Sequence, residues 1–233
     1  MPDIASQLEA TRARLARAEQ TALRPAGSVK LLAVSKTFPA EAVRAAFAAG
    51  QRAFGENYVQ EALDKIAALS DLRDQLEWHF IGPLQSNKSR AVAEHFDWVH
   101  SVDRLKIAQR LSEQRPADLP PLNLCLQVNI SGETSKSGAT LAEAPALAHA
   151  IAALPRVRLR GLMAIPEPSQ TLQLQRLPHR MLFDLYVALR NQGLDLDTLS
   201  AGMSDDMEAA ILEGATMVRI GTAIFGSRHP AHP

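Results

Sequence analysis

The segment VKLLAVSKTFPAEAVRAAFAAG, residues 29–50, shows the unit from which the chain is built. Its first part, Val29–Lys36, is apolar on both faces, which is typical of a strand covered by helices on one side and by a packed interior on the other. Apolar residues then recur at helical spacing over Pro39–Ala49, and Gly50 closes the helix. The segment therefore predicts a strand followed by a helix, which is the repeating unit of a parallel α/β fold.

The same pattern recurs along the whole chain. Eight short apolar runs predict strands: Val29–Lys36, Arg52–Asn57, Glu77–Leu84, Asp97–Asp103, Leu122–Ser131, Arg156–Pro166, Thr198–Ser204 and Met217–Thr222. Seven segments have helical spacing: Pro39–Ala49, Tyr58–Leu69, Asn87–His95, Arg104–Gln114, Leu141–Leu154, His179–Asn191 and Asp205–Glu213. The stretch Glu167–Pro178 is predicted to be a loop.

Repeated strand and helix units with right-handed crossovers give either an open doubly wound sheet or a closed barrel. No glycine-rich dinucleotide fingerprint or P-loop follows the first strand, which weakens the open sheet as a nucleotide binder. Eight units favour the barrel. We therefore predict an α/β fold in which residues 1–233 form a single-domain (β/α)8 TIM barrel with an extra N-terminal helix.

Composition and charge exclude several classes of protein. The 233 residues include 25 Lys and Arg against 25 Asp and Glu, so the formal net charge is +0. Nucleic-acid and membrane-surface proteins need a clustered basic excess, so we expect neither partner. Hydrophobic residues make up 46% of the chain, which is enough for a sizeable core and excludes global disorder.

The cysteine content and the N-terminus indicate a cytoplasmic protein. The single cysteine, Cys125, lies in the apolar run LNLCLQVNI, so we expect a buried thiol and a reducing compartment. The N-terminal residues lack the apolar centre of a signal peptide. Ile4, Leu8, Leu15 and Ala22 fall on one helical face, which predicts a leading surface helix.

Functional groups of a (β/α)8 barrel lie at the carboxyl ends of the strands. The first predicted strand ends at Lys36, which is followed by Thr37, Phe38 and Pro39. A lysine there is either solvated and inert, or it points over the barrel mouth as an amine nucleophile. Position alone favours the inert lysine, because most lysines are surface charges.

The last two predicted strands end in loops suited to an anion. LSAGMSDDMEAAI contains Ser204, and VRIGTAIFG contains Gly221 and Thr222. Glycine lets backbone N–H groups approach an anion and hydroxyl groups donate to it, as in the usual phosphate site of these barrels. The alternative is that Ser204 is a plain helix N-cap. Asp205 and Asp206 are then first-turn carboxylates of that helix, and we expect no metal site there.

An amine at the end of the first strand, facing a phosphate site across the barrel mouth, suits pyridoxal phosphate, whose aldehyde and phosphate lie on neighbouring ring substituents. Six ordered blocks also match one family over nearly the whole chain: LLAVSKTFP from Leu31, FGENYVQEA from Phe54, WHFIGPLQSNK from Trp78, VNISGETSKSG from Val128, GLMAIP from Gly161 and LSAGMSDDMEAAILEGATMVRIGTAIFG from Leu199. The chain resembles the pyridoxal phosphate homeostasis proteins (the YggS/PROSC family), whose barrel is similar to that of alanine racemases.

The resemblance implies pyridoxal phosphate as cofactor and a role for six residues. Lys36 would form the Schiff base, Arg219 would face the pyridine nitrogen, and Asn57 would lie close to the ring. Three residues would bind the phosphate: Ser204, Gly221 and Thr222. The resemblance leaves the roles of four further residues open: His79, Lys136, Ser200 and Met203.

Three functions remain open at this point. The protein is a non-enzymatic carrier that holds and hands over pyridoxal phosphate, a racemase-like enzyme, or a barrel in which Lys36 is merely structural. The carrier is favoured because racemases supply a second acid/base, a tyrosine, from a separate C-terminal domain. Here Tyr58 and Tyr186 lie in predicted helices. An always-charged arginine on the pyridine nitrogen would also leave the ring a weak electron sink. We expect a monomer, with pyridoxal-phosphate-dependent apoenzymes or vitamin B6 salvage enzymes as partners.

Overall fold

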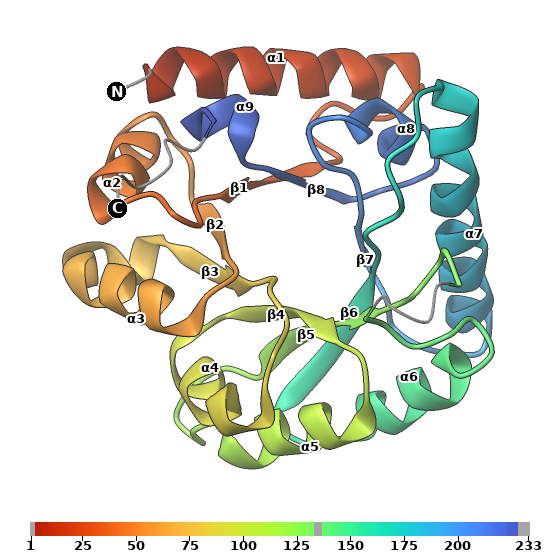
Figure 1. Cartoon of the computed structure of the whole chain (residues 1–233). Helices are drawn as coiled ribbons and strands as arrows, with labels where there is room; N and C mark the ends of the chain where they lie inside the picture. The colour runs from red at the N-terminus through yellow and green to blue at the C-terminus, as the bar shows by residue number, and fades with distance from the viewer. Residues whose placement is uncertain (1–2, 133–136, 228–233) are drawn as a thin grey trace, which may run out of the picture.

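Eight parallel strands follow one another around a closed barrel in the order of the sequence, as Figure 1 shows. The structure is a computed structural model that describes residues 3–132 and 137–227. The strands are β1 (Lys30–Val34), β2 (Ala53–Glu56), β3 (Glu77–Phe80), β4 (Trp98–Val102), β5 (Leu122–Gln127), β6 (Val157–Met163), β7 (Thr198–Ser200) and β8 (Met217–Ile220). The ring closes where β1 pairs with β8, from Lys30 with Met217 to Ala33 with Ile220. The predicted barrel is confirmed.

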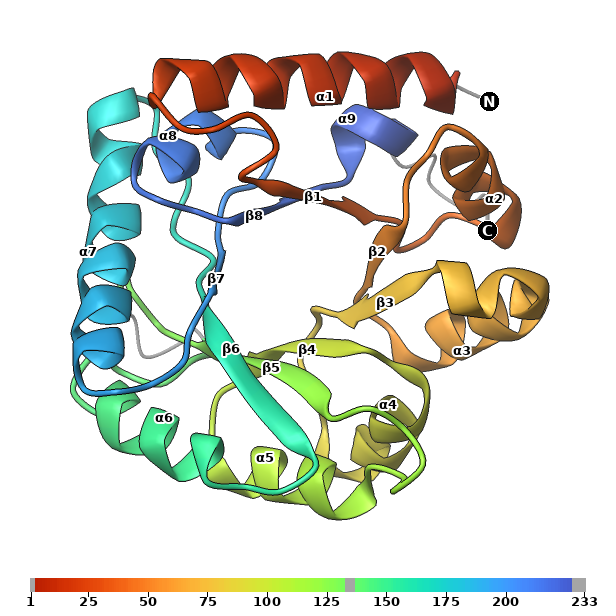
Figure 2. The ribbon, with the colours of Figure 1, turned by 180° about the vertical axis from the view of Figure 1, so that it is seen from behind.

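Helices surround the barrel on the outside, as the two opposite views show (Figures 1 and 2). They are α1 (Ile4–Thr21), α2 (Ala40–Ala48), α3 (Val59–Ala68), α4 (Ser89–His95), α5 (Leu105–Gln114), α6 (Ala144–Ala152), α7 (Leu172–Asn191), α8 (Met207–Leu212) and α9 (Thr222–Phe225), with short 3₁₀ helices η1 (Ser70–Gln75) and η2 (Ser86–Lys88). The predicted leading helix is α1, which packs along α8 and α9. Its residues Ile4, Leu8 and Leu15 are buried, and Ala22 is partly buried at the C-cap.

Side chains of the strands alternate between two environments, because successive residues of a strand point to opposite faces. On β3, Trp78 and Phe80 are buried in the large core between barrel and helices. His79 lies between them and points into the barrel, where its ring stacks on Trp98 at 5.3 Å. Cys125 is buried in the interior beside Trp98 and Met163, as expected, and burial raises the pKa of its thiol to about 12.

The predicted loop over Glu167–Pro178 is confirmed for residues 167–171 but is wrong from Leu172 onward, where α7 begins, and this helix contains Pro178. Pro178 cannot donate a hydrogen bond to the carbonyl of Leu174, so the sequence signal indicated a helix that begins later. Side-chain bonds attach these first turns to the chain around α8. Gln175 donates to the carbonyls of Ser169 and Asp205, at 2.8 and 3.2 Å. Arg176 pairs with Glu213 at 2.6 Å.

The last two strands are shorter than predicted. β7 ends at Ser200 rather than at Ser204, and β8 ends at Ile220 rather than at Thr222. Thr222 begins the short helix α9, because the N–H groups of residues 224 and 225 both donate to the carbonyl of Gly221, at 2.9 Å. Phe225 is thereby buried against Phe38, with ring centroids 5.3 Å apart. Residues 201–204 and Gly221 therefore belong to the loops at the barrel mouth.

Candidate functional site

All six residues that the sequence analysis selected line one cavity at the carboxyl ends of the strands. The cavity has a volume of about 250 Å³. Its lining includes Lys36, Asn57, Ser204, Arg219, Gly221 and Thr222. They come from the ends of β1, β2, β7 and β8 and from the loops that follow. The structure thus brings together the predicted amine, the predicted phosphate residues and the predicted ring-facing arginine.

Lys36 lies at a sharp turn between β1 and α2. The N–H of Ser35 still donates to the carbonyl of Gly55 on β2, at 3.0 Å, so the sheet pairing continues to the residue before the lysine. The next residue, Thr37, has a φ of 67°, in the left-handed region that β-branched residues rarely occupy. This turn ends the strand at the rim of the cavity and places Lys36 there.

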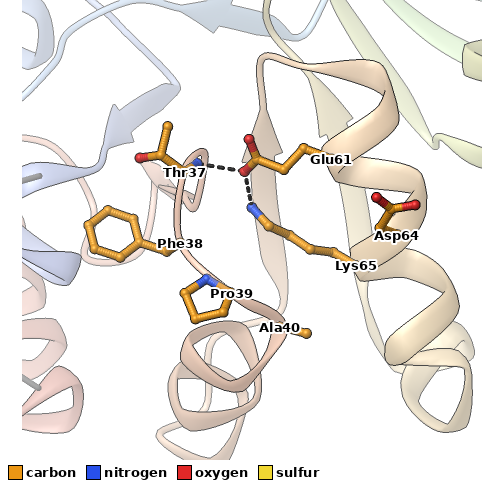
Figure 3. A pocket seen from close by; sticks show the side chains of 7 residues that line it. All are labelled: Thr37, Phe38, Pro39, Ala40, Glu61, Asp64 and Lys65. Carbon is orange, nitrogen blue, oxygen red and sulfur yellow. Dashed lines mark hydrogen bonds and ion pairs between the residues drawn. The ribbon is translucent and has the colours of Figure 1, made fainter. Parts of the chain in front are cut away.

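A network of charged side chains holds this turn, and Figure 3 shows the part of it formed by Thr37, Glu61 and Lys65. The N–H of Thr37 donates to the carboxylate of Glu61 at 2.5 Å. Lys65 Nζ donates to Glu61 at 2.6 Å, to Glu56 at 2.8 Å and to the carbonyl of Ser35 at 2.7 Å. All three protons of the buried ammonium are therefore used. Because the network joins β1, β2 and α3, the left-handed turn is maintained by ionic contacts.

This network was missed by the sequence analysis. Glu61 and Lys65 are four residues apart on α3, a spacing at which opposite charges on a helix meet, and that spacing was a usable signal. Glu56 is completely buried, and burial raises its pKa although Lys65 and Ser35 act in the opposite direction. A separate surface pocket of about 540 Å³ lies beside the network, between Phe38 and α3.

Ser204 lies in the loop that precedes α8 but does not cap that helix. The N-cap is Asp206, so the alternative role as an N-cap is wrong for Ser204. Asp206 accepts the N–H of Met203 at 2.7 Å, and its other oxygen contacts His179 Nε2 at 2.9 Å. These two contacts of Asp206 hold the loop in place. Among the described residues none is a hydrogen-bond partner of Ser204 Oγ, so the hydroxyl is available to a bound anion.

Gly221 and Thr222 line the same cavity as Ser204. A Cβ atom on Gly221 would lie 3.2 Å from the carbonyl oxygen of Val34, which is closer than most such contacts. Glycine therefore lets β8 pass close to β1 at this point. Thr222 begins α9, and N–H groups in the first turn of a helix lack acceptors within the helix.

Arg219 is buried and held in one orientation. Its Nη1 donates to the carbonyl and to the hydroxyl of Ser200, at 2.6 and 2.7 Å, and its Nη2 donates to the carbonyl of Ala164 at 2.9 Å. Burial lowers the pKa of Arg219 to about 10, an effect that the charge of Asp206 opposes. The guanidinium therefore stays positive at neutral pH and presents only donors to the cavity.

Asn57 follows β2 and lies where the cavity adjoins a second one. A Cβ atom on Gly82 would come within 2.1 Å of the carbonyl oxygen of Asn57, so only glycine fits beside this backbone. Asn57 Oδ1 is buried and has no hydrogen-bond partner among the described residues. The second cavity, of about 470 Å³, shares Asn57, Ile81, Ile165 and Met203 with the first. The site thus opens into a wider cleft.

The four residues left without a role have different positions. Met203 lines both cavities, and Ser200 anchors Arg219. His79 lies in the barrel interior and does not line the site. Lys136 lies outside the described residues.

The donor set fits pyridoxal phosphate. An amine, hydroxyl and backbone donors for a phosphate, a cationic donor and an unpartnered buried acceptor line the same small cavity. Fold and site together define a barrel of the alanine racemase class. The family described as alanine racemase, N-terminal domain, matches residues 6–229. The alanine racemase of Corynebacterium glutamicum has the same fold at 19% identity, with a TM-score of 0.67 over 98% of this chain and 62% of that chain.

The chain belongs to the pyridoxal phosphate homeostasis protein family. It is 62% identical to the pyridoxal phosphate homeostasis protein of Pseudomonas aeruginosa, over 100% of this chain and 99% of the relative. It is 58% identical to that of Escherichia coli K12, over 98% of both chains. The structure of PipY from Synechococcus elongatus with pyridoxal phosphate bound is similar at 41% identity, with a TM-score of 0.83 over 96% of this chain and 100% of that chain. Among the described helices none has the length and apolarity to cross a membrane.

Proposed function

We propose that this protein binds pyridoxal 5'-phosphate as a Schiff base on Lys36 and passes it on, as part of intracellular pyridoxal phosphate homeostasis. The observation that carries the proposal is one cavity that is lined by Lys36, by Arg219 and by the three residues proposed to bind the phosphate. The names of the relatives and the ligand of PipY support the same cofactor. The whole chain, residues 1–233, would act as one cofactor-binding barrel.

Each side chain of the site has a proposed task. Lys36 would supply the amine that condenses with the aldehyde of the cofactor, with the loss of one water molecule. Ser204 and the backbone at Gly221 and Thr222 donate to the phosphate, which gives charge-assisted hydrogen bonds and most of the affinity. Arg219 donates to the pyridine nitrogen, and Asn57 lies beside the ring.

A carrier is favoured over a racemase by the surroundings of the two tyrosines. Racemisation requires an acid/base on each face of the substrate carbon. The hydroxyl of Tyr186 is buried and donates to the carbonyl of Leu196 at 3.0 Å, and Tyr58 is the exposed N-cap of α3. Neither residue lines the cavity. A strong electron sink also needs a protonated pyridine nitrogen. Arg219 would instead donate a hydrogen bond to this nitrogen and leave it unprotonated.

We further propose a cytoplasmic monomer that exchanges cofactor with pyridoxal-phosphate-dependent apoenzymes or vitamin B6 salvage enzymes. The buried thiol of Cys125 is consistent with a reducing compartment. The wide cleft that adjoins the site would admit the amine that takes the cofactor over.

Borohydride reduction followed by peptide mapping tests the covalent site. We expect the added mass of the reduced cofactor on Lys36 and on no other lysine. Lys36→Ala should fold normally, because an amine at the end of a strand contributes little to the core, but should lose the adduct. Lys88→Ala, at the exposed end of η2, is the matched control and should keep it. An adduct mapped to Lys30 or Lys88 would contradict the assignment.

Deuterium exchange at the α-carbon of alanine tests the carrier against the racemase. We expect the protein to exchange this proton no faster than free cofactor does at the same concentration, because positioned acid/base catalysis, worth about 10²–10⁴-fold, lacks its second group. Strong exchange by the wild type that Lys36→Ala abolishes would establish the enzyme instead.

A further inference from the structure

A line of polar side chains crosses the barrel interior beneath the cavity. Arg219 Nη1 lies 2.7 Å from Ser200 Oγ, which lies 2.8 Å from His100 Nδ1. His100 Nε2 lies 2.8 Å from His79 Nδ1, and His79 Nε2 lies 2.5 Å from Glu77 Oε1. These residues come from β8, β7, β4 and β3, and the three in the middle have no exposed surface. The line is a continuous set of hydrogen bonds.

The line joins the two ends of the barrel. Arg219 borders the cavity at the carboxyl ends of the strands. Glu77 is the first residue of β3, at the opposite end, where its partly exposed carboxylate also pairs with Lys30, the first residue of β1. One terminus of the line is therefore a cation at the site, and the other is a carboxylate near solvent.

The carboxylate terminus imposes one direction on the protons. Burial would raise the pKa of Glu77, but the contacts with His79 and Lys30 lower it to about 2, so the carboxylate accepts and His79 Nε2 must donate. At the other end, Arg219 always donates to Ser200 Oγ, and the hydroxyl can then either donate to His100 or accept a second hydrogen bond from it. Burial lowers the pKa of both His79 and His100, so both rings are neutral and each has one donor and one acceptor.

A single arrangement satisfies every contact. His79 donates through Nε2 to Glu77 and accepts at Nδ1, so His100 donates through Nε2. His100 then accepts at Nδ1, and the hydroxyl of Ser200 donates to it while accepting from Arg219. Every proton points away from Arg219 and towards Glu77.

We propose that Glu77, His79, His100 and Ser200 form a hydrogen-bond relay of fixed direction that positions the Arg219 guanidinium from the far end of the barrel. Both protons of Nη1 are used by Ser200, and one proton of Nη2 is used by Ala164. Nε and the second Nη2 proton have no acceptor among the described residues, and Arg219 lines the cavity, so these donors are available to a bound molecule. A bound molecule must therefore offer an acceptor there, and this step rests on the proposed function.

A core cluster of merely structural histidines would behave differently. In such a cluster, a change at Glu77 alters its direct partners, His79 and Lys30, and nothing else. In a relay of fixed direction, the change at Glu77 also alters which ring nitrogen of His100 carries the proton, although His100 does not contact Glu77. The tautomer of His100 is thus the observation that separates the two.

Nitrogen NMR of the cofactor-free, 15N-labelled protein tests the direction of the relay. We expect His79 and His100, assigned through His79→Gln and His100→Gln, to be neutral and protonated at Nε2 at pH 7.5. Glu77→Gln should make both histidines lose this single tautomer, because the new amide can donate to His79. Glu208→Gln, at the surface ion pair with Arg14, is the matched control and should leave both unchanged.

The possible outcomes each decide the proposal. A wild-type histidine in the relay that is cationic or protonated at Nδ1 overturns the direction, and this holds whether or not the variant folds. An unchanged His100 in Glu77→Gln overturns the relay. Titration with pyridoxal phosphate tests the positioning: Glu77→Gln should bind roughly two- to tenfold more weakly than wild type, and equal affinity overturns this step. If the wild type fails to bind, the proposed function fails while the NMR result stands.

Discussion

Ser204 is the residue whose loss should separate phosphate binding from the rest of the site. Its hydroxyl lines the cavity and has no hydrogen-bond partner among the described residues. Ser204→Ala should weaken pyridoxal phosphate binding by roughly 10–100-fold, because a hydrogen bond to a charged group is lost. Binding of pyridoxal, which has no phosphate, should not change. Absorbance titrations with both forms measure this, and the exposed Ser70→Ala is the control. An equal loss for both forms would refute a phosphate contact.

Lys65 stabilises the turn after Lys36 by neutralising two carboxylates. Lys65→Met leaves Glu56 buried without its cationic partner, so the free energy of unfolding should fall by about 3–5 kcal/mol. Arg44→Met removes the cation from an exposed pair with Asp71 and should change the free energy of unfolding little, because solvent screens such pairs. Urea unfolding measures both values. Similar small losses for the two variants would show that the buried network adds little stability.

Helix α7 offers a prediction at the scale of an element. Pro178 lies in its interior, where proline removes a hydrogen bond and clashes with the preceding turn. Pro178→Ala should therefore raise the free energy of unfolding by about 1–3 kcal/mol, the larger freedom of the unfolded alanine chain offsetting part of the gain. Pro145→Ala, in the first turn of α6, is the matched control and should give no gain, since proline is compatible with that position. Thermal unfolding of both variants decides the matter.

The sequence was sufficient to predict elements that repeat a local pattern. The eight strands and the barrel followed from apolar runs separated by helical spacing, and all eight exist, with ends shifted by a few residues. The start of α7 was missed because Pro178 dominates the local signal, whereas the contacts that hold its first turns come from Asp205 and Glu213. Boundaries that depend on distant partners cannot be recognised from local pattern.

Part of the candidate site could likewise be predicted from the sequence, and part of it could not. Lys36 and the loops near Ser204 and Gly221 were selected because each follows a strand, and the structure brings them to one cavity. The network around Lys65 and the line through His100 were not predicted. Members in direct contact are up to 100 residues apart in the sequence, as His100 and Ser200 are, and only the closed barrel brings such residues together. Glu61 and Lys65, by contrast, lie four residues apart on α3.

The buried histidines also set a pH dependence of the whole molecule. Burial lowers the pKa of both His79 and His100, so the folded state resists the protons that the unfolded chain binds. Stability is therefore fully present above the unfolded pKa of about 6.5 and is lost as the pH falls below it. The free energy of unfolding should decrease as the pH is lowered from 7.5 to 5.0.

Urea unfolding at several pH values measures this loss. The charged groups that face His79 are Glu77 and Lys30, with Asp97 farther away, and those that face His100 are Lys30 and Arg219. Glu77 adds a second pH range in which stability changes. Its folded pKa of about 2 lies below its ordinary value of 4.5, so its contribution to stability is lost as the pH falls between these two values. His100→Gln should reduce the loss of stability between pH 7.5 and 5.0, whereas the exposed His149→Gln should not.

The seam between β1 and β8 determines when the site comes into existence during translation. Lys36 follows the first strand, whereas Arg219 lies on the last, and the two share a cavity only after these strands have paired. A nascent chain held on the ribosome before β8 emerges has the lysine but lacks the arginine and the glycine beside it. Such a chain lacks part of the proposed cofactor site, so we expect it to capture pyridoxal phosphate only after β1 and β8 have paired and the ring has closed.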